Sequence, residues 1–127
     1  MDCRCDHNST AAYPIVSGTA ETVELKITSP SGVDDVESVT AYFTAGRHPS
    51  IAVNCTLDRA SDGCHAYALL TAEQTEALGE YARNGDRIHM CAHVAWTDGT
   101  EDPISFGGTR DNPVYELPIR VVTCHHN

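Results

Sequence analysis

The sequence has little positive charge. It contains a single lysine, Lys26, and seven arginines against 18 acidic residues, so its formal net charge is −10. Proteins that bind a phosphate backbone or an anionic membrane surface gather Lys and Arg on one face. The composition therefore argues against nucleic acid and membranes as partners, and the excess negative charge favours solubility.

Long apolar runs are also missing. No stretch approaches the roughly 20 apolar residues that a membrane-spanning helix requires. Residues 1–7 (MDCRCDH) have no apolar core of the kind that a secretory signal contains. We therefore expect synthesis in the cytoplasm without a signal peptide.

The motifs of common enzyme sites are absent too. There is no Gly-x-Ser-x-Gly elbow and no phosphate-binding or dinucleotide-binding glycine motif. The carboxylates at Asp34–Asp35 and within residues 98–102 stand beside turn-forming residues, which is typical of solvated turns. We predict that the protein is not an enzyme.

What the sequence does contain is a series of short segments with strand character. In several of them apolar residues alternate with polar ones, which is the period of a half-buried strand. The segments are 22–28, 36–44, 51–57, 64–70, 86–96, 104–106 and 115–121. Turn signals such as Ser61-Asp62-Gly63 separate them. Pro118 in the last segment predicts an edge position for that strand.

One segment has helical character. Thr71 and Gln74 have the spacing of a capping box, and Asn84-Gly85 is a stop signal, so we predict a short helix over about 71–82. About seven or eight short strands without a strand–helix–strand rhythm predict an all-β sandwich. We assign residues 13–123 to this domain, 1–12 to a flexible N-terminal arm and 124–127 to a C-terminal tail.

Six cysteines raise the question of a disulfide. Cys55 and Cys64 flank the Ser61-Asp62-Gly63 turn, so pairing of their strands would bring the two thiols towards each other. The alternative is that both are free thiols packed as small apolar residues, as free cysteine often is. We favour the free thiols, because the turn alone does not fix the cross-strand alignment.

Two groups of residues have the chemistry of zinc ligands. One combines both ends of the chain, and its members are Cys3, Cys5, His7, Cys124, His125 and His126. Their spacing departs from that of standard zinc modules. We expect no cofactor, and zinc is the metal that these residues would take if one bound.

The second group lies on one predicted strand. His89, Cys91 and His93 occupy alternate positions and therefore share the face opposite the apolar stripe, with His65 on the preceding strand as a fourth ligand. The alternative is a polar face that is solvated or that contacts another subunit, and we favour that interpretation.

The order of these elements resembles the immunoglobulin-like domains of tailed-phage virion proteins. The motifs that carry the resemblance are VESVTAYFT (36–44), a hairpin, the helix start TAEQT (71–75) and the strand RIHMCAHVAWTDGT (87–100). It covers roughly residues 23–122. Upper-baseplate N-terminal domains and neck, tail and head-decoration modules share this order. The resemblance implies an immunoglobulin-like β-sandwich.

The resemblance also implies a role. We expect a non-enzymatic structural protein of the virion, made in the host cytoplasm, that binds capsid or tail proteins as a decoration, neck or head–tail connector protein. Such a protein would be a homo-oligomer or part of a symmetric assembly of many copies. The alternatives are a cell-surface or carbohydrate-binding module, and a metal-binding domain that uses the Cys and His residues.

Overall fold

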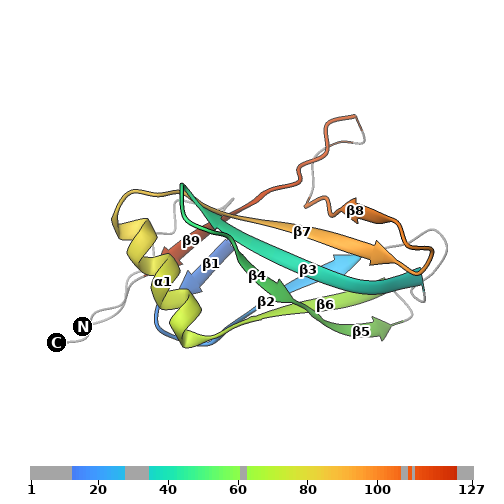
Figure 1. The fold of residues 1–127 in the computed structure, drawn as a ribbon, viewed down its shortest axis with the longest axis horizontal. Helices are drawn as coiled ribbons and strands as arrows, with labels where there is room; N and C mark the ends of the chain where they lie inside the picture. Colours follow the sequence, from blue (N-terminus) through green and yellow to red (C-terminus); the bar gives the residue numbers. More distant parts are fainter. Residues whose placement is uncertain (1–12, 28–34, 61–62, 107–108, 110, 123–127) are drawn as a thin grey trace.

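The computed structural model describes residues 13–27, 35–60, 63–106, 109 and 111–122 (Figure 1). This part of the chain forms nine strands and one helix. The elements are β1 (Tyr13–Val16), β2 (Glu21–Ile27), β3 (Val36–Ala45), β4 (Ile51–Asn54), β5 (Thr56–Ala60), β6 (Gly63–Leu70), α1 (Ala72–Arg83), β7 (Ile88–Trp96), β8 (Glu101–Pro103) and β9 (Leu117–Val122). The predicted arm at 1–12 and tail at 124–127 lie outside the described residues.

The strands form two sheets. The larger has the order β1-β9-β7-β3-β4, with β8 paired to β7, and the smaller has the order β2-β6-β5. Strand β1 runs parallel to β9, and the other pairs are antiparallel. When β2 to β7 and β9 are named B, C, C′, D, E, F and G, the sheets become B-E-D and G-F-C-C′, as in immunoglobulin domains. The predicted all-β sandwich with one short helix is confirmed.

The core lies between the two sheets and is built from the alternating apolar positions. Phe43 of β3 pairs with Met90 of β7, and both side chains are fully buried. Full burial of a large apolar side chain contributes about 1.5–3 kcal/mol, so these rows hold the sheets together. Trp96, at the end of the β7 stripe, only packs against the margin of this core.

The predicted strand 51–57 is in fact two strands in different sheets. Residues Ile51–Asn54 pair with β3, whereas Thr56–Ala60 pair with β6. The change occurs at Cys55, whose N–H donates to the carbonyl oxygen of Val39 at 2.8 Å. This division, together with β1, which the sequence analysis missed, explains why nine strands form instead of seven or eight.

The predicted edge position of Pro118 is wrong. Strand β9 lies between β1 and β7, and Pro118 pairs with His89 of β7. Proline is tolerated there because the pairing with β1 begins only at Ile119, one residue later.

The strand predicted at 104–106 lies earlier in the chain than expected. Strand β8 covers Glu101–Pro103, and the buried Ile104 follows it.

The helix α1 begins and ends as predicted. Thr71 and Gln74 form the capping box, and Gly85 adopts a φ of 94° just after the C-cap Asn84. The helix covers one end of the sandwich beside β1 and β9 (Figure 1). The buried Thr75 fixes it there, since its hydroxyl donates to the carbonyl oxygen of Thr19 at 2.7 Å and accepts the N–H of Gly18 at 3.0 Å.

Candidate functional site

Strand β7 carries His89, Cys91 and His93 on the outer face of the larger sheet. The buried residues of this strand alternate with them, so the prediction that the three share one face is confirmed. The ring of His93 meets that of Tyr42 edge-on, with centroids 5.8 Å apart. Burial, and next the charge of Glu116, raises the pKa of the Cys91 thiol.

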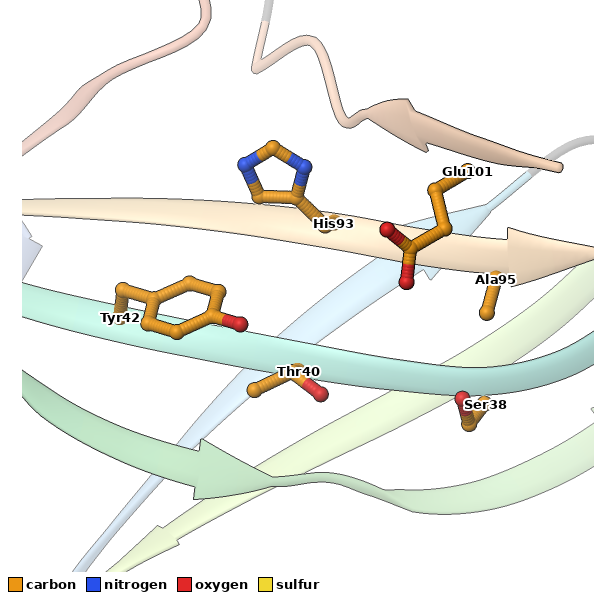
Figure 2. Close-up of a pocket in the computed structure, with 6 residues that line it drawn as sticks. All are labelled: Ser38, Thr40, Tyr42, His93, Ala95 and Glu101. Atoms are coloured by element: carbon orange, nitrogen blue, oxygen red, sulfur yellow. The ribbon is translucent and has the colours of Figure 1, made fainter.

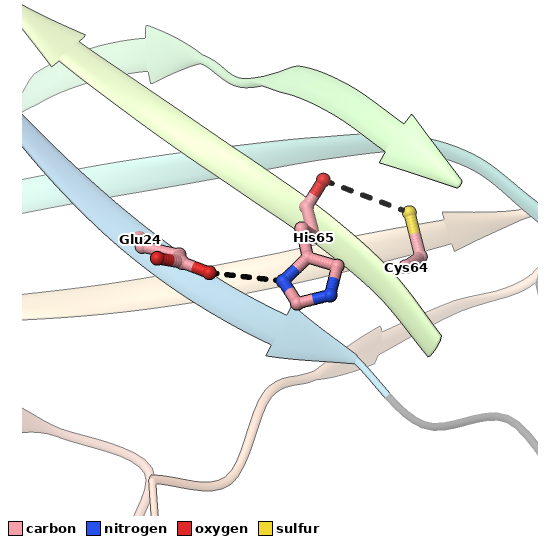
Figure 3. Close-up of polar contacts among 3 residues, drawn as sticks. All are labelled: Glu24, Cys64 and His65. Atoms are coloured by element: carbon pink, nitrogen blue, oxygen red, sulfur yellow. Dashed lines mark hydrogen bonds and ion pairs between the residues drawn. The ribbon is translucent and has the colours of Figure 1, made fainter. Parts of the chain in front are cut away.

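His65 does not join that group. It lies on β6 in the smaller sheet, because the chain passes through α1 and into the other sheet before β7 begins. Its Nδ1 is 2.9 Å from Oε1 of Glu24 on the neighbouring strand β2 (Figure 3). No cluster of three or more His, Cys, Asp or Glu side chains in the described residues has the arrangement of a metal site. The zinc ligands Cys3, Cys5, His7, Cys124, His125 and His126 lie outside those residues.

No disulfide joins Cys55 and Cys64 in the structure, and both are present as thiols. The pairing of β5 with β6 places Cys64 opposite Arg59, and Cys55 precedes the first paired residue, Thr56. The two cysteines therefore stand at different rungs of the hairpin, which is why no disulfide joins them. Cys64 is fully buried, and its thiol donates weakly to the carbonyl oxygen of His65 at 3.9 Å (Figure 3).

A polar groove lies on the outer face between β3, β7 and β8. Its volume is about 210 Å³, and its lining residues are Ser38, Thr40, Tyr42, His93, Ala95 and Glu101. Figure 2 shows the Glu101 carboxylate over β7, between His93 and Ala95 and directed towards β3. Hydroxyls, an imidazole and a carboxylate that face one hollow can bind a polar ligand through several hydrogen bonds at once.

Sequence analysis had pointed only to His93 in this groove. The alternation that puts Val39 and Phe43 inside also puts Thr40 and Tyr42 outside, so the polar face of β3 was present in the sequence. Glu101 had been placed in a solvated turn, and it is exposed in the structure. Its position over the groove follows from the pairing of Ala95 with Glu101, which a local pattern does not reveal.

The neighbouring carboxylate of Asp102 has a separate role. Its Oδ2 accepts the indole N–H of Trp96 at 2.7 Å, which satisfies the polar end of this half-buried ring. A hollow of about 320 Å³ lies beside the two residues and is lined also by Ile27 and Ile104. The bond orients the indole at the margin of the core.

The described residues between β8 and β9 that follow the buried Ile104 form the β8–β9 arm (residues 105–106, 109 and 111–116), and they extend away from the sandwich (Figure 1). The N–H of Phe106 donates to the carbonyl oxygen of Val114 at 2.6 Å, which joins its two sides. Val114 and Tyr115 are each 45% exposed, and they are two of the three large apolar side chains exposed among the described residues, the third being Leu69. The arm therefore presents apolar surface to solvent.

Fold and site together define an immunoglobulin-like sandwich domain with a polar groove on one face and an arm that exposes Val114 and Tyr115. Comparisons with models of protein families, with curated proteins and with solved structures found no match for this chain. Among the described residues, no helix has the length and apolar character that crossing a lipid bilayer requires.

Proposed function

We propose that this chain is a non-enzymatic structural component of a tailed-phage or phage-like virion that binds capsid or tail subunits. Its place in the particle would be that of a decoration, neck or connector protein, present in several symmetric copies. The resemblance of its strand and turn motifs to virion immunoglobulin-like domains supports this role, and so does the immunoglobulin order of its strands.

The observation that carries the proposal is the β8–β9 arm. In immunoglobulin domains the loop between strands F and G lies at an end of the sandwich, and in variable domains it belongs to the binding surface. Here that loop is long and exposes Val114 and Tyr115. An exposed tyrosine such as Tyr115 is the kind of anchor that supplies much of the binding energy at a protein–protein interface, and Val114 adds exposed apolar area next to it.

The test is association with particles. The wild-type protein should sediment with purified virions of the phage that encodes it, and the double substitution Val114→Ser and Tyr115→Ser should reduce this by roughly tenfold or more. The matched control is Leu69→Ser, which removes the third exposed apolar side chain from the smaller sheet and should leave binding unchanged. Absence of the protein from purified particles would disprove the role.

The polar groove favours a second candidate function, a carbohydrate-binding module. Sugar sites combine hydroxyl and carboxylate partners with an aromatic ring, and Thr40, Glu101 and Tyr42 supply these groups. A glycan array distinguishes the two candidates. Hits that Tyr42→Ala abolishes would favour the carbohydrate module, whereas an array without hits would exclude it.

A further inference from the structure

Two arginines lie near the start of β7: Arg87 directly precedes the strand, and Arg120 belongs to the neighbouring β9. Ile88 of β7 pairs with Ile119 of β9, and continuing this register by one residue places Arg87 opposite Arg120. Like charges directly across two strands destabilise a sheet. An anion held between the two guanidinium groups would remove that repulsion.

Arg120 is the more unusual of the pair. Its Nε and Nη1 atoms are shielded from solvent and form no hydrogen bond. A charged group withdrawn from water without a partner is costly, so natural structures nearly always pair it. The guanidinium offers its donors in a planar fork, which matches the two oxygens of a carboxylate or a phosphate group.

A hollow of about 410 Å³, lined in part by Arg120, lies where the end of α1 and the start of β7 meet β9. Its lining includes Ala82, Asp86, Arg87, His89, Pro118 and Arg120. Asp86 supplies the one carboxylate among these lining residues, and its Oδ2 also lies 3.1 Å from Nε2 of His48. Two arginines against one carboxylate leave the hollow with an excess of positive charge, in a chain of net charge −10.

We propose that this hollow, the Arg87–Arg120 site, binds an oxyanion: a carboxylate or a phosphate group held by Arg120 and faced by Arg87. The ring of His89 lines the same space and is a third nitrogen-bearing group. The overall negative charge of the protein repels anions, so binding depends on these local donors. The site is separate from the polar groove and from the β8–β9 arm, and the proposal does not rest on the proposed function.

Titration of the whole protein with inorganic phosphate, and separately with acetate, tests the site at an ionic strength kept constant with chloride. The expected result is a saturable rise in melting temperature and a shift of the Arg120 Nε–H resonance in NMR spectra. Arg120→Gln should weaken binding roughly tenfold or more, because it removes a charge-assisted pair. The matched control is Arg47→Gln, which changes the net charge equally at an exposed position between β3 and β4 and should bind as the wild type does.

If Arg120→Gln folds poorly, a second variant separates loss of anion binding from loss of folding. Arg120→Met keeps an unbranched apolar chain as far as the position of Nε and removes the charged group, so it should melt at a higher temperature than the wild type in chloride alone and respond to neither anion. A stronger response of the wild type to phosphate identifies a phosphate group as the ligand, and a stronger response to acetate identifies a carboxylate. Equal responses of the wild type and Arg120→Gln, or no response of the wild type to either anion, would overturn the proposal.

Discussion

The imidazole ring of His48 stacks on the phenol ring of Tyr81, with centroids 3.7 Å apart and 12° between the ring planes. His48 lies between β3 and β4, and Tyr81 lies in α1, so this contact joins the edge of the larger sheet to the helix. Gly46 in the same turn has a φ of +54°, and a Cβ atom there would lie 2.7 Å from Oδ1 of Asp86. The turn therefore packs closely against the connection from α1 to β7.

This stacking predicts an energetic coupling. The single substitutions His48→Ala and Tyr81→Ala should each lower the free energy of unfolding, and a double-mutant cycle should give a coupling of about 0.5–1.5 kcal/mol. Urea denaturation measures all four proteins. As a control, Tyr81→Ala combined with His93→Ala should be additive within about 0.5 kcal/mol, because no contact joins these residues. Additivity for His48 and Tyr81 as well would contradict the coupling.

Removing the buried hydroxyl of Thr75 should strongly lower the free energy of unfolding. Thr75→Val keeps the shape of this fully buried side chain but leaves the N–H of Gly18 and the carbonyl oxygen of Thr19 without their partner. The expected loss is about 2–3 kcal/mol of unfolding free energy. Thr75→Ser, which keeps the hydroxyl, should lose less. A larger loss for Thr75→Ser than for Thr75→Val would contradict this, because it would show that packing of the methyl group outweighs the hydrogen bonds.

For Gly79→Ala, two effects on the unfolding free energy have opposite signs. Intrinsic propensity favours alanine over glycine in a helix by about 1 kcal/mol, but a Cβ atom at Gly79 would overlap the side chain of Ser17. We therefore expect Gly79→Ala to lower the unfolding free energy by about 1–3 kcal/mol, as overpacking does.

A second substitution at Ser17 should restore the stability that Gly79→Ala removes. Ser17→Gly removes both atoms that the new methyl group would overlap, so Gly79→Ala should cost much less in a Ser17→Gly background. Thermal unfolding of the four proteins shows whether it does. If Gly79→Ala stabilises the protein in the wild-type background, the close approach of α1 to Ser17 is not maintained in solution.

Local sequence patterns predicted those elements whose cause is itself local. The alternation in residues 36–44 and 86–96 predicted β3 and β7 and the inward face of each, and the Thr71–Gln74 capping box predicted the start of α1. The division at Cys55 was missed because a period of two looks the same whichever sheet a strand joins. The position of β9 was missed because it depends on β1, about a hundred residues away along the chain.

Site residues could be predicted from the sequence where they lie on one strand, but not where they lie on different strands. His89, Cys91 and His93 share a face because they belong to one strand, which the sequence shows directly. The association of Arg87 with Arg120, and of Ala95 with Glu101, depends on the register between strands. The placement of His65 was wrong for a related reason, since adjacency in sequence does not establish that two strands lie in the same sheet.

The thiol of Cys55 predicts a pH-dependent reactivity. Burial raises its pKa to about 11, and only the thiolate reacts with iodoacetamide. At pH 8 the folded protein should therefore be alkylated at Cys55 roughly a hundredfold more slowly than the urea-unfolded protein, in which the thiol has an ordinary pKa of about 8.5. Peptide mass spectrometry of timed samples measures this rate for Cys55 alone.

The same shift makes Cys55 contribute to stability in a defined pH range. Between the unfolded pKa and a folded pKa of about 11, the unfolded chain binds fewer protons than the folded one at this site, so raising the pH favours unfolding. The contribution is fully present below about pH 8.5 and is lost as the pH rises towards 11. Cys55→Ala should therefore lose less stability than the wild type between pH 8 and pH 10.5, as measured by urea denaturation. Parallel losses in the two proteins would show that other groups cause the alkaline unfolding.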